Sequence, residues 1–209
     1  MMKGIDISKF NQVFDYNKIK EDDIDFAIIR CTGMKAQYGG AMPYKDPSFE
    51  KHYSGCKAAG LYVGAYAYIA PVAGRLPREH AEFILNVLKG KVFEMPIYID
   101  VEAWKQKDRI LNTNYVYDVC RYLEEKGSFV GVYGSDISTF KDMLQISGVE
   151  PFTWWVARYG KHPEYATKNL HIWQTTSTGV ISGIKGLVDL DVSYLDFPKI
   201  IKKKNLNRF

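Results

Sequence analysis

The 209-residue sequence lacks the features that would place it in several large classes of protein. It has only three cysteines, Cys31, Cys56 and Cys120, an odd and scattered set that argues against a disulfide framework and predicts small buried apolar residues. The longest apolar run, residues 61–72, is too short to span a bilayer, so no membrane insertion is expected. Lys3 follows two methionines without the apolar stretch of a secretion signal, which predicts a product made in the cytoplasm without a signal peptide.

Motifs for nucleotide, metal and acyl-transfer chemistry are also missing. No P-loop or G-x-G-x-x-G follows a predicted strand, and no Ser or Cys stands in a nucleophile elbow. The four histidines lack the spacing of metal ligands, so neither a metal site nor a cofactor is expected. The net charge of +4 is compatible with anionic polymers as partners. However, no basic helix is interleaved with aromatic residues, so nucleic-acid binding is not expected.

What the sequence does contain is a regular alternation of strand and helix patterns. Helical periodicity occurs at residues 16–21, 47–59, 77–88, 114–126 and 137–144, between the earlier strands. Such alternation predicts right-handed crossovers and a parallel sheet, and eight strands suggest closure. We predict an α/β fold, an irregular TIM-like barrel of eight strands with helices mainly after the first five. The predicted strands are residues 4–7, 26–31, 61–69, 96–101, 129–133, 153–157, 170–173 and 187–190.

The barrel is expected to occupy residues 1–198 and to be followed by a basic tail at 199–209. Five of the eleven tail residues are Lys or Arg. A solvated end that contributes only solubility is one interpretation. Attraction to anionic polymers of a cell wall is the other.

The stretch Pro-Ile-Tyr-Ile-Asp-Val-Glu at residues 96–102 carries the most informative chemistry. Asp100 and Glu102 are two positions apart, so on a strand their side chains share a face, with Cα atoms about 6.5 Å apart. Two close carboxyls in a partly dry site do not both ionise easily, and one keeps its proton near neutral pH. This pair suits acid-assisted cleavage of a glycosidic bond. An arbitrary D-x-E is more often the fraying end of a strand.

The rest of the rim strengthens the catalytic interpretation. Asp6, Asp189 and Asp191 lie at the ends of other predicted strands, and closure of the barrel would bring Asp6 beside Asp189, giving an acidic floor. Each aspartate alone is more often a turn former. Arg30 would either hold a carboxylate in its charged form or face solvent. The expected substrate contacts are Arg30, Tyr66, Tyr68, Tyr133, Trp155, Tyr159 and Gln174, with Trp173 nearby; strand alternation would send about half of the aromatic side chains into packing instead.

Taken together, these residues resemble the glycoside hydrolase family 25 lysozymes, the N-acetylmuramidases of the Chalaropsis type. The resemblance spans about residues 3–195 and rests on residues 4–8, 26–32, 96–102, 154–159, and 172–174 with 188–190. It implies an irregular eight-stranded barrel with helices mainly in the first five units. It also implies that Glu102 is the general acid, Asp100 its charged partner, and Asp6 and Asp189 supporting carboxylates.

The resemblance further implies a peptidoglycan hydrolase that cleaves the bond between N-acetylmuramic acid and N-acetylglucosamine and causes lysis. Release from the host cell, as for a phage endolysin, is the expected route to the wall; a bacterial enzyme exported unconventionally is the alternative. A chitinase-like glycosidase would need an aspartate where Tyr98 stands, and the intact carboxylates argue against a silent sugar-binding barrel. Inversion, retention and substrate assistance all stay open.

The chain departs from the family pattern at three places. Gly33-Met34 stands where the family usually has Glu-Gly, Ala67 where it has histidine, and Asp191 where asparagine is common. These departures bear on substrate contacts and leave the D-x-E pair intact.

Overall fold

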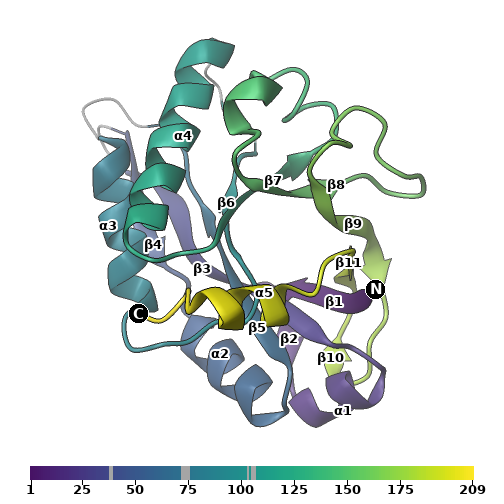
Figure 1. Ribbon diagram of the computed structural model, residues 1–209. Helices are drawn as coiled ribbons and strands as arrows, with labels where there is room; N and C mark the ends of the chain where they lie inside the picture. Colours follow the sequence, from purple (N-terminus) through teal and green to yellow (C-terminus); the bar gives the residue numbers. More distant parts are fainter. Residues whose placement is uncertain (38–39, 72–75, 103, 105–106) are drawn as a thin grey trace.

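The computed structural model describes residues 1–209 except 38–39, 72–75, 103 and 105–106 and the side chains of 36–37 and 40–41. Eight strands close into a barrel in the order β1-β11-β9-β8-β7-β6-β5-β3, with β3 pairing back onto β1 (Figure 1). The α/β barrel prediction is therefore confirmed. The barrel strands are β1 (Met2–Ile7), β3 (Phe26–Gln37), β5 (Tyr62–Tyr68), β6 (Ile97–Asp100), β7 (Val130–Ser135), β8 (Thr153–Ala157), β9 (Leu170–Gly179) and β11 (Val188–Ser193).

One barrel strand runs in the opposite direction to the others. β11 pairs antiparallel with both β1 and β9, whereas the remaining neighbours in the barrel are parallel. The expectation of a wholly parallel sheet is wrong here, because β9 and β11 are joined without a crossover helix. Their connection carries only β10 (Ile184–Lys185), which pairs with β2 (Gln12–Val13) in a separate small ribbon.

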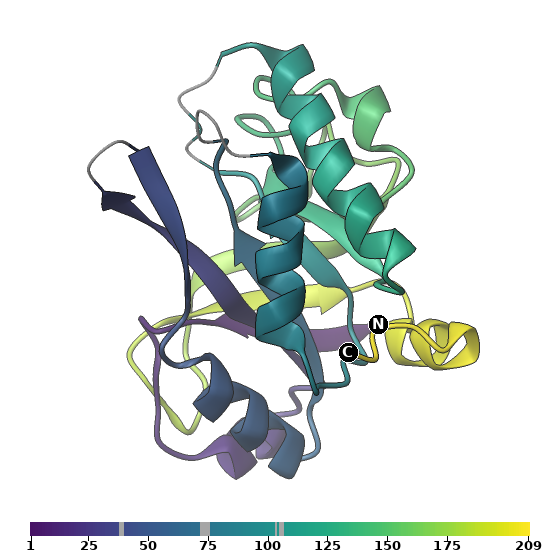
Figure 2. The same ribbon diagram turned by 90° about the vertical axis from the view of Figure 1, so that its left-hand side faces the viewer.

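A hairpin extends the barrel beyond its rim. β3 continues past the predicted end of its strand and pairs antiparallel with β4 (Gly40–Lys45). Figure 2 shows this hairpin projecting from one end of the barrel, while α5 (Phe197–Lys204) covers the opposite end.

The helices pack around the outside of the sheet. α1 (Tyr16–Glu21) and α3 (Pro77–Leu88) have the predicted bounds, and α2 (Phe49–Ala58) and α4 (Arg109–Glu125) overlap the predicted ranges. The helix expected at residues 137–144 is wrong; turns occupy this segment and lead to the 3₁₀ helix η1 (Ile146–Val149). Ser135 and Thr139 exchange side-chain-to-backbone hydrogen bonds there, and such bonds compete with helical pairing.

The core has two parts, one between sheet and helices and one inside the barrel. Phe26 fills the interior beside Gly4, where a Cβ would lie 2.2 Å from the ring. All three cysteines are free and buried, as predicted. No helix among the described residues is long and apolar enough to cross a membrane.

The chain end predicted as a basic tail is partly built into the barrel base. Phe197 and Ile201 of α5 are buried, and the boundary expected at residue 198 lies inside this helix. Asn207 is also buried; its Nδ2 donates to Met95 O at 2.9 Å and its Oδ1 accepts from Phe129 N at 2.7 Å. The end of the chain therefore seals the end of the barrel opposite the hairpin.

Candidate active site

The predicted acidic residues gather at the rim that carries the hairpin. Asp100 ends β6 and Glu102 follows it, while Asp6 lies near the end of β1 in register with Asp189. Asp189 stands at the start of antiparallel β11, so it reaches the same rim as the ends of the parallel strands. Asp6 and Asp189 are therefore neighbours, as predicted, although β11 runs antiparallel to β1 and not parallel as expected.

The D-x-E pair occupies two different environments. Asp100 is buried, and burial raises its pKa well above the usual range; the charge of Glu102 adds to this and Arg30 opposes it. Glu102 is half-buried. Its pKa is raised first by burial and further by Asp189, whereas the nearby Tyr133 hydroxyl lowers it. A proton is therefore held at this pair at a pH where isolated carboxyls are ionised.

The supporting carboxyls are protonated more readily than usual as well. Burial is the largest cause of the raised pKa of Asp6, followed by the charges of Asp191 and Asp189. Burial also raises the pKa values of Asp189 and Asp191. The rim therefore carries fewer negative charges near neutral pH than its carboxyls would have in water.

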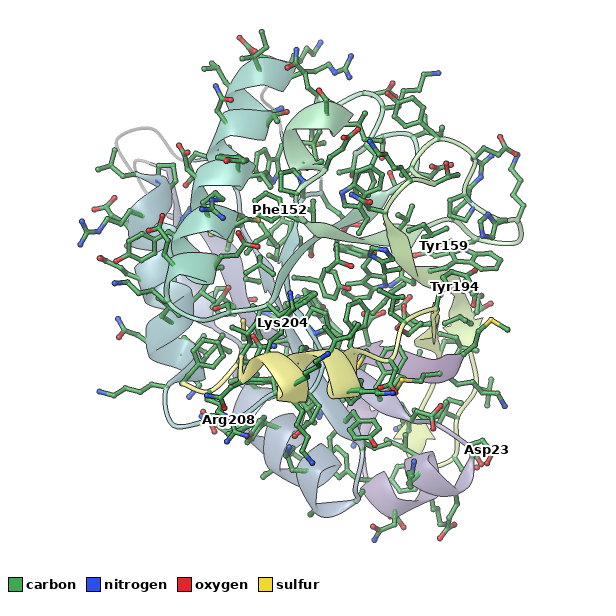
Figure 3. All side chains as sticks on the ribbon, viewed as in Figure 1. Asp23, Phe152, Tyr159, Tyr194, Lys204 and Arg208 are labelled. Carbon is green, nitrogen blue, oxygen red and sulfur yellow. The ribbon has the colours of Figure 1, made fainter. Side chains whose placement is uncertain are left out.

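Gln174 connects the carboxyls to two tyrosines. Its Nε2 donates to Asp6 Oδ2 at 2.6 Å, and its Oε1 accepts from Tyr133 Oη at 2.9 Å and Tyr159 Oη at 3.1 Å. These three bonds fix the orientation of the amide. Tyr159 is 51% exposed and lies after β8 (Figure 3), so it brings the network from the buried floor to the mouth of the site.

Trp155 lies beneath the site instead of at its surface. The side chain is 1% exposed, and its ring centroid lies 4.1 Å from that of Tyr133, 5.4 Å from Tyr98 and 5.9 Å from Tyr66. Its Nε1 donates to Asp191 Oδ1 at 2.8 Å. Trp155 was predicted as a substrate contact, but it is buried and packs beneath Tyr133 and Tyr66. Tyr98 is fully buried under the same floor.

Arg30 was predicted either to pair with a carboxylate or to face solvent. It pairs with a carboxylate, that of Asp46. Arg30 Nε donates to Asp46 Oδ2 at 2.6 Å in a buried pair. Asp46 also accepts from the backbone N–H groups of Lys9 and Ser48. Asp46 is not among the predicted site residues, because an Asp before Pro at a helix start is typical of a cap. Arg30 still acts on the site by opposing the raised pKa of Asp100.

The remaining predicted contacts divide between the rim and the barrel exterior. Tyr68 is half-buried beside the D-x-E pair, whose charges add to burial in raising its pKa. Tyr66 is also half-buried, and its pKa is raised by burial and by Asp6. Trp173 instead donates from Nε1 to Arg158 O at 2.8 Å and does not join this cluster.

This arrangement can supply acid catalysis beside a second carboxyl group. Glu102 is the more exposed acid of the pair, and the tyrosines Tyr68, Tyr133 and Tyr159 lie near it. Among the described residues, no group of His, Cys, Asp and Glu is placed to hold a metal ion.

Comparisons with known proteins agree with this chemistry. The model of the glycosyl hydrolases family 25 matches residues 5–184. The autolytic lysozyme of Clostridium acetobutylicum is 30% identical over 190 residues, which are 91% of this chain and 55% of that protein. The chain thus spans about half the length of this curated relative.

Two solved structures show the same fold. The CTP1L endolysin superposes with a TM-score of 0.80 at 25% identity, over 97% of this chain and 70% of that one. The catalytic domain of endolysin ply40 from bacteriophage P40 of Listeria monocytogenes gives 0.76 at 24% identity, over 97% of both chains.

Proposed function

Because the chain belongs to the glycosyl hydrolases family 25, we propose that it is a lysozyme acting on bacterial peptidoglycan. The bond cleaved is the β-1,4 link from N-acetylmuramic acid to N-acetylglucosamine. The observation that carries the proposal is the D-x-E pair at the rim, in which Asp100 is buried and Glu102 is half-buried with a raised pKa. The name of the autolytic lysozyme from Clostridium acetobutylicum supports the same substrate.

Glu102 is the general acid in this proposal. Its raised pKa keeps the proton on the carboxyl, and its partial exposure lets it reach the leaving glycosidic oxygen. The proton passes to that oxygen as the C–O bond breaks, and water supplies the new hydroxyl of the sugar. Asp100 is the proposed charged partner: burial and Glu102 raise its pKa, Arg30 opposes them, and an anion at this position would stabilise positive charge developing on the sugar.

Asp6 and Asp189 support the pair from the neighbouring strands. The register of Asp6 with Asp189 across β1 and β11 supports this role, as does the hydrogen bond from Gln174 to Asp6. Substrate hydroxyl and acetamide groups bind to Tyr66, Tyr68, Tyr133, Tyr159 and Gln174. Trp155 supports these rings from below, through its contacts with Tyr133 and Tyr66.

The place of action is the cell wall, where release from the producing cell brings the enzyme to its substrate. The names of the autolytic lysozyme and of two endolysins support this location. Anionic wall polymers are proposed as a second partner, attracted by the lysines of α5. Lys199, Lys202, Lys203 and Lys204 are all exposed there.

Mass spectrometry of digested peptidoglycan tests the bond that is cleaved. New reducing ends on N-acetylmuramic acid are the expected result, and new reducing ends on N-acetylglucosamine would refute the proposal. A chitinase would require an aspartate at position 98, but Tyr98 stands there and is buried. Chitin oligosaccharides are therefore expected to be poor substrates.

A further inference from the structure

We propose that Lys9, Phe10 and Tyr44 form an outer subsite for a carboxylate-bearing sugar of the glycan strand. This set, the Phe10 platform, would take the ring of an N-acetylmuramic acid residue on Phe10 and its carboxylate at Lys9. The inference rests on the proposed function and names a substrate contact outside the carboxylate floor.

Phe10 presents a large apolar surface from a fixed position. The ring is 78% exposed, although it belongs to the loop that directly follows Asp6 on β1. That loop is held by Ser8 and Asn11: Ser8 Oγ accepts from Phe10 N at 3.3 Å, and Asn11 Oδ1 accepts from Ser8 N at 2.9 Å. A rigid exposed ring beside a site loses little conformational entropy when a ligand packs on it.

Two cations lie close to the Phe10 ring, which stays largely exposed. The guanidinium carbon of Arg30 lies 4.9 Å from the ring centroid. Arg30 also lowers the pKa of Asp100, so the platform lies next to the candidate site. Lys9 Nζ lies 5.2 Å from the Phe10 centroid and 4.9 Å from that of Tyr44. The Lys9 ammonium is therefore held between two rings. Within the described residues it forms no ion pair, so its charge is available to a ligand anion.

Gly33 makes room for this arrangement. It faces Tyr44 across the β3–β4 hairpin, and a Cβ at position 33 would lie 2.8 Å from Cζ and Oη of Tyr44. Any larger residue would push the Tyr44 ring out of place. Gly33 is one of the positions where the chain departs from the family pattern.

The combination of ring and cation selects the ligand chemistry. The apolar C–H face of a pyranose packs on an aromatic ring, and an ammonium attracts a carboxylate. N-acetylmuramic acid supplies both groups in one residue, through its sugar ring and lactyl carboxylate. N-acetylglucosamine supplies only the ring, so the two sugars distinguish the roles of Phe10 and Lys9.

Calorimetric binding to the full chain carrying Glu102→Gln tests the platform without turnover. The probes are a tetrasaccharide of alternating N-acetylglucosamine and N-acetylmuramic acid with free lactyl carboxylates, and chitotetraose. Adding Phe10→Ala should weaken binding of both roughly tenfold, and Phe10→Trp should restore it. Lys9→Met should weaken only the muramyl probe, about two- to fivefold, and high salt should remove this difference.

Two further variants sharpen the test. Gly33→Ala should reproduce the loss seen with Lys9→Met, because displacing Tyr44 frees the ammonium. Tyr62→Ala is the control; this tyrosine is 43% exposed at the start of β5, at the opposite end of the barrel, and its loss should change nothing. Thermal unfolding of each variant verifies the fold.

The outcomes separate the platform from the proposed function. Binding by the Glu102→Gln parent with no loss on Phe10→Ala would overturn the platform alone. Equal loss of both probes on Lys9→Met would overturn the assignment of the carboxylate. A parent that binds neither probe would overturn the proposed function and the platform with it.

Discussion

Glu102 differs from Asp100 in how far its carboxyl is exposed, and this difference separates their chemistry. A fully buried acid cannot approach a glycosidic oxygen, whereas a half-buried acid with a raised pKa can both keep a proton and deliver it. Asp100 is buried instead, and burial and the charge of Glu102 raise its pKa while Arg30 opposes them. The two roles thus follow from position within one short segment.

Glu102→Gln should leave the fold intact and lower kcat by about 10²–10⁴-fold, because an amide cannot protonate the leaving oxygen. Turnover of purified peptidoglycan, measured beside thermal unfolding, checks both parts. Glu150→Gln is the matched control, since Glu150 pairs with Lys168 on the surface. Activity above about a tenth of the wild-type value would assign the acid elsewhere. Asp100→Asn should also lower kcat severely, and Asp6→Asn or Asp189→Asn should lower it less.

The pH profile of kcat/KM should move in opposite directions in two variants. Glu102 must be protonated to act, so activity falls as pH rises through its pKa. Asp189 contributes to raising that pKa, so Asp189→Asn should lower it and shift the alkaline limb to lower pH. The Tyr133 hydroxyl lowers it, so Tyr133→Phe should shift the limb to higher pH. Shifts of the same sign would contradict the assignment of this limb to Glu102.

Asp191 should lower stability near neutral pH. Burial raises its pKa well above the usual value, the Trp155 N–H opposes this, and the charge of Asp189 adds to it. The folded state therefore binds more protons than the unfolded state as pH rises above the unfolded pKa, and the free energy of unfolding falls across that window. At lower pH both states are protonated and this loss disappears.

Asp191→Asn removes the titration and keeps an acceptor for Trp155 Nε1. Its melting temperature should exceed the wild-type value by a few degrees near pH 7, since about 1 kcal/mol shifts Tm by about 2–4 °C at this chain length. Calorimetry near pH 7 and near pH 4 should show the gain shrinking at the lower pH. The exposed Asp142→Asn is the control. A gain that is equal at both pH values would exclude the carboxyl as its cause.

At the level of secondary structure, the sequence predicted where helices and strands occur better than it predicted how the strands run and pair. α1 and α3 carry periodicity and terminal signals of their own, and the structure reproduces their predicted bounds. The direction of β11 depends on how its connection to β9 folds, and the strand pattern is the same in either direction. The hydrogen bond from Gln174 to Asp6 joins residues 168 positions apart, which only the closed barrel brings together.

Two other elements, the β3–β4 hairpin and α5, were not predicted because of the residues they contain. The β3–β4 hairpin contains Gly33 and Pro43, which weaken a strand pattern. α5 has a start signal at Asp196, whose side chain accepts from Lys199 N, and an end at Asn205 with φ of 54°. Placing the tail boundary at residue 198 separated Phe197 from Ile201, the two buried residues four positions apart that make the helix amphipathic.

Ile201→Ala should lower the free energy of unfolding by about 2–5 kcal/mol, because it removes a buried side chain from the base of the barrel. Ile200→Ala is the matched comparison on the same helix, where the side chain is half-buried, and its loss should be clearly smaller. Chemical denaturation measures both. Equal losses would show that α5 does not close the barrel through Ile201.

Across the whole molecule, the carboxyls of the candidate site and the lysines of α5 lie at opposite ends of the barrel. The carboxyls lie at the rim with the hairpin, and Figure 2 shows α5 at the other end of the barrel. The lysines of α5 are exposed. Figure 3 labels Lys204 and Arg208 there. An anionic polymer held by α5 would therefore lie away from the carboxylates, so this attraction retains the enzyme near the wall without presenting that same strand for cleavage.

Replacing Lys202, Lys203 and Lys204 with Gln should lower binding to purified walls at low salt and leave kcat/KM on soluble glycan fragments unchanged. The three side chains are exposed, whereas deleting residues 200–209 would also remove buried Ile201 and Asn207 and unfold the base. The difference from wild type should fade as salt shortens the screening length to about 8–10 Å and below. Unchanged wall binding at low salt would leave these lysines as a solubilising surface. A fall in kcat/KM on soluble fragments would instead show that charge at the α5 end acts on the distant catalytic rim.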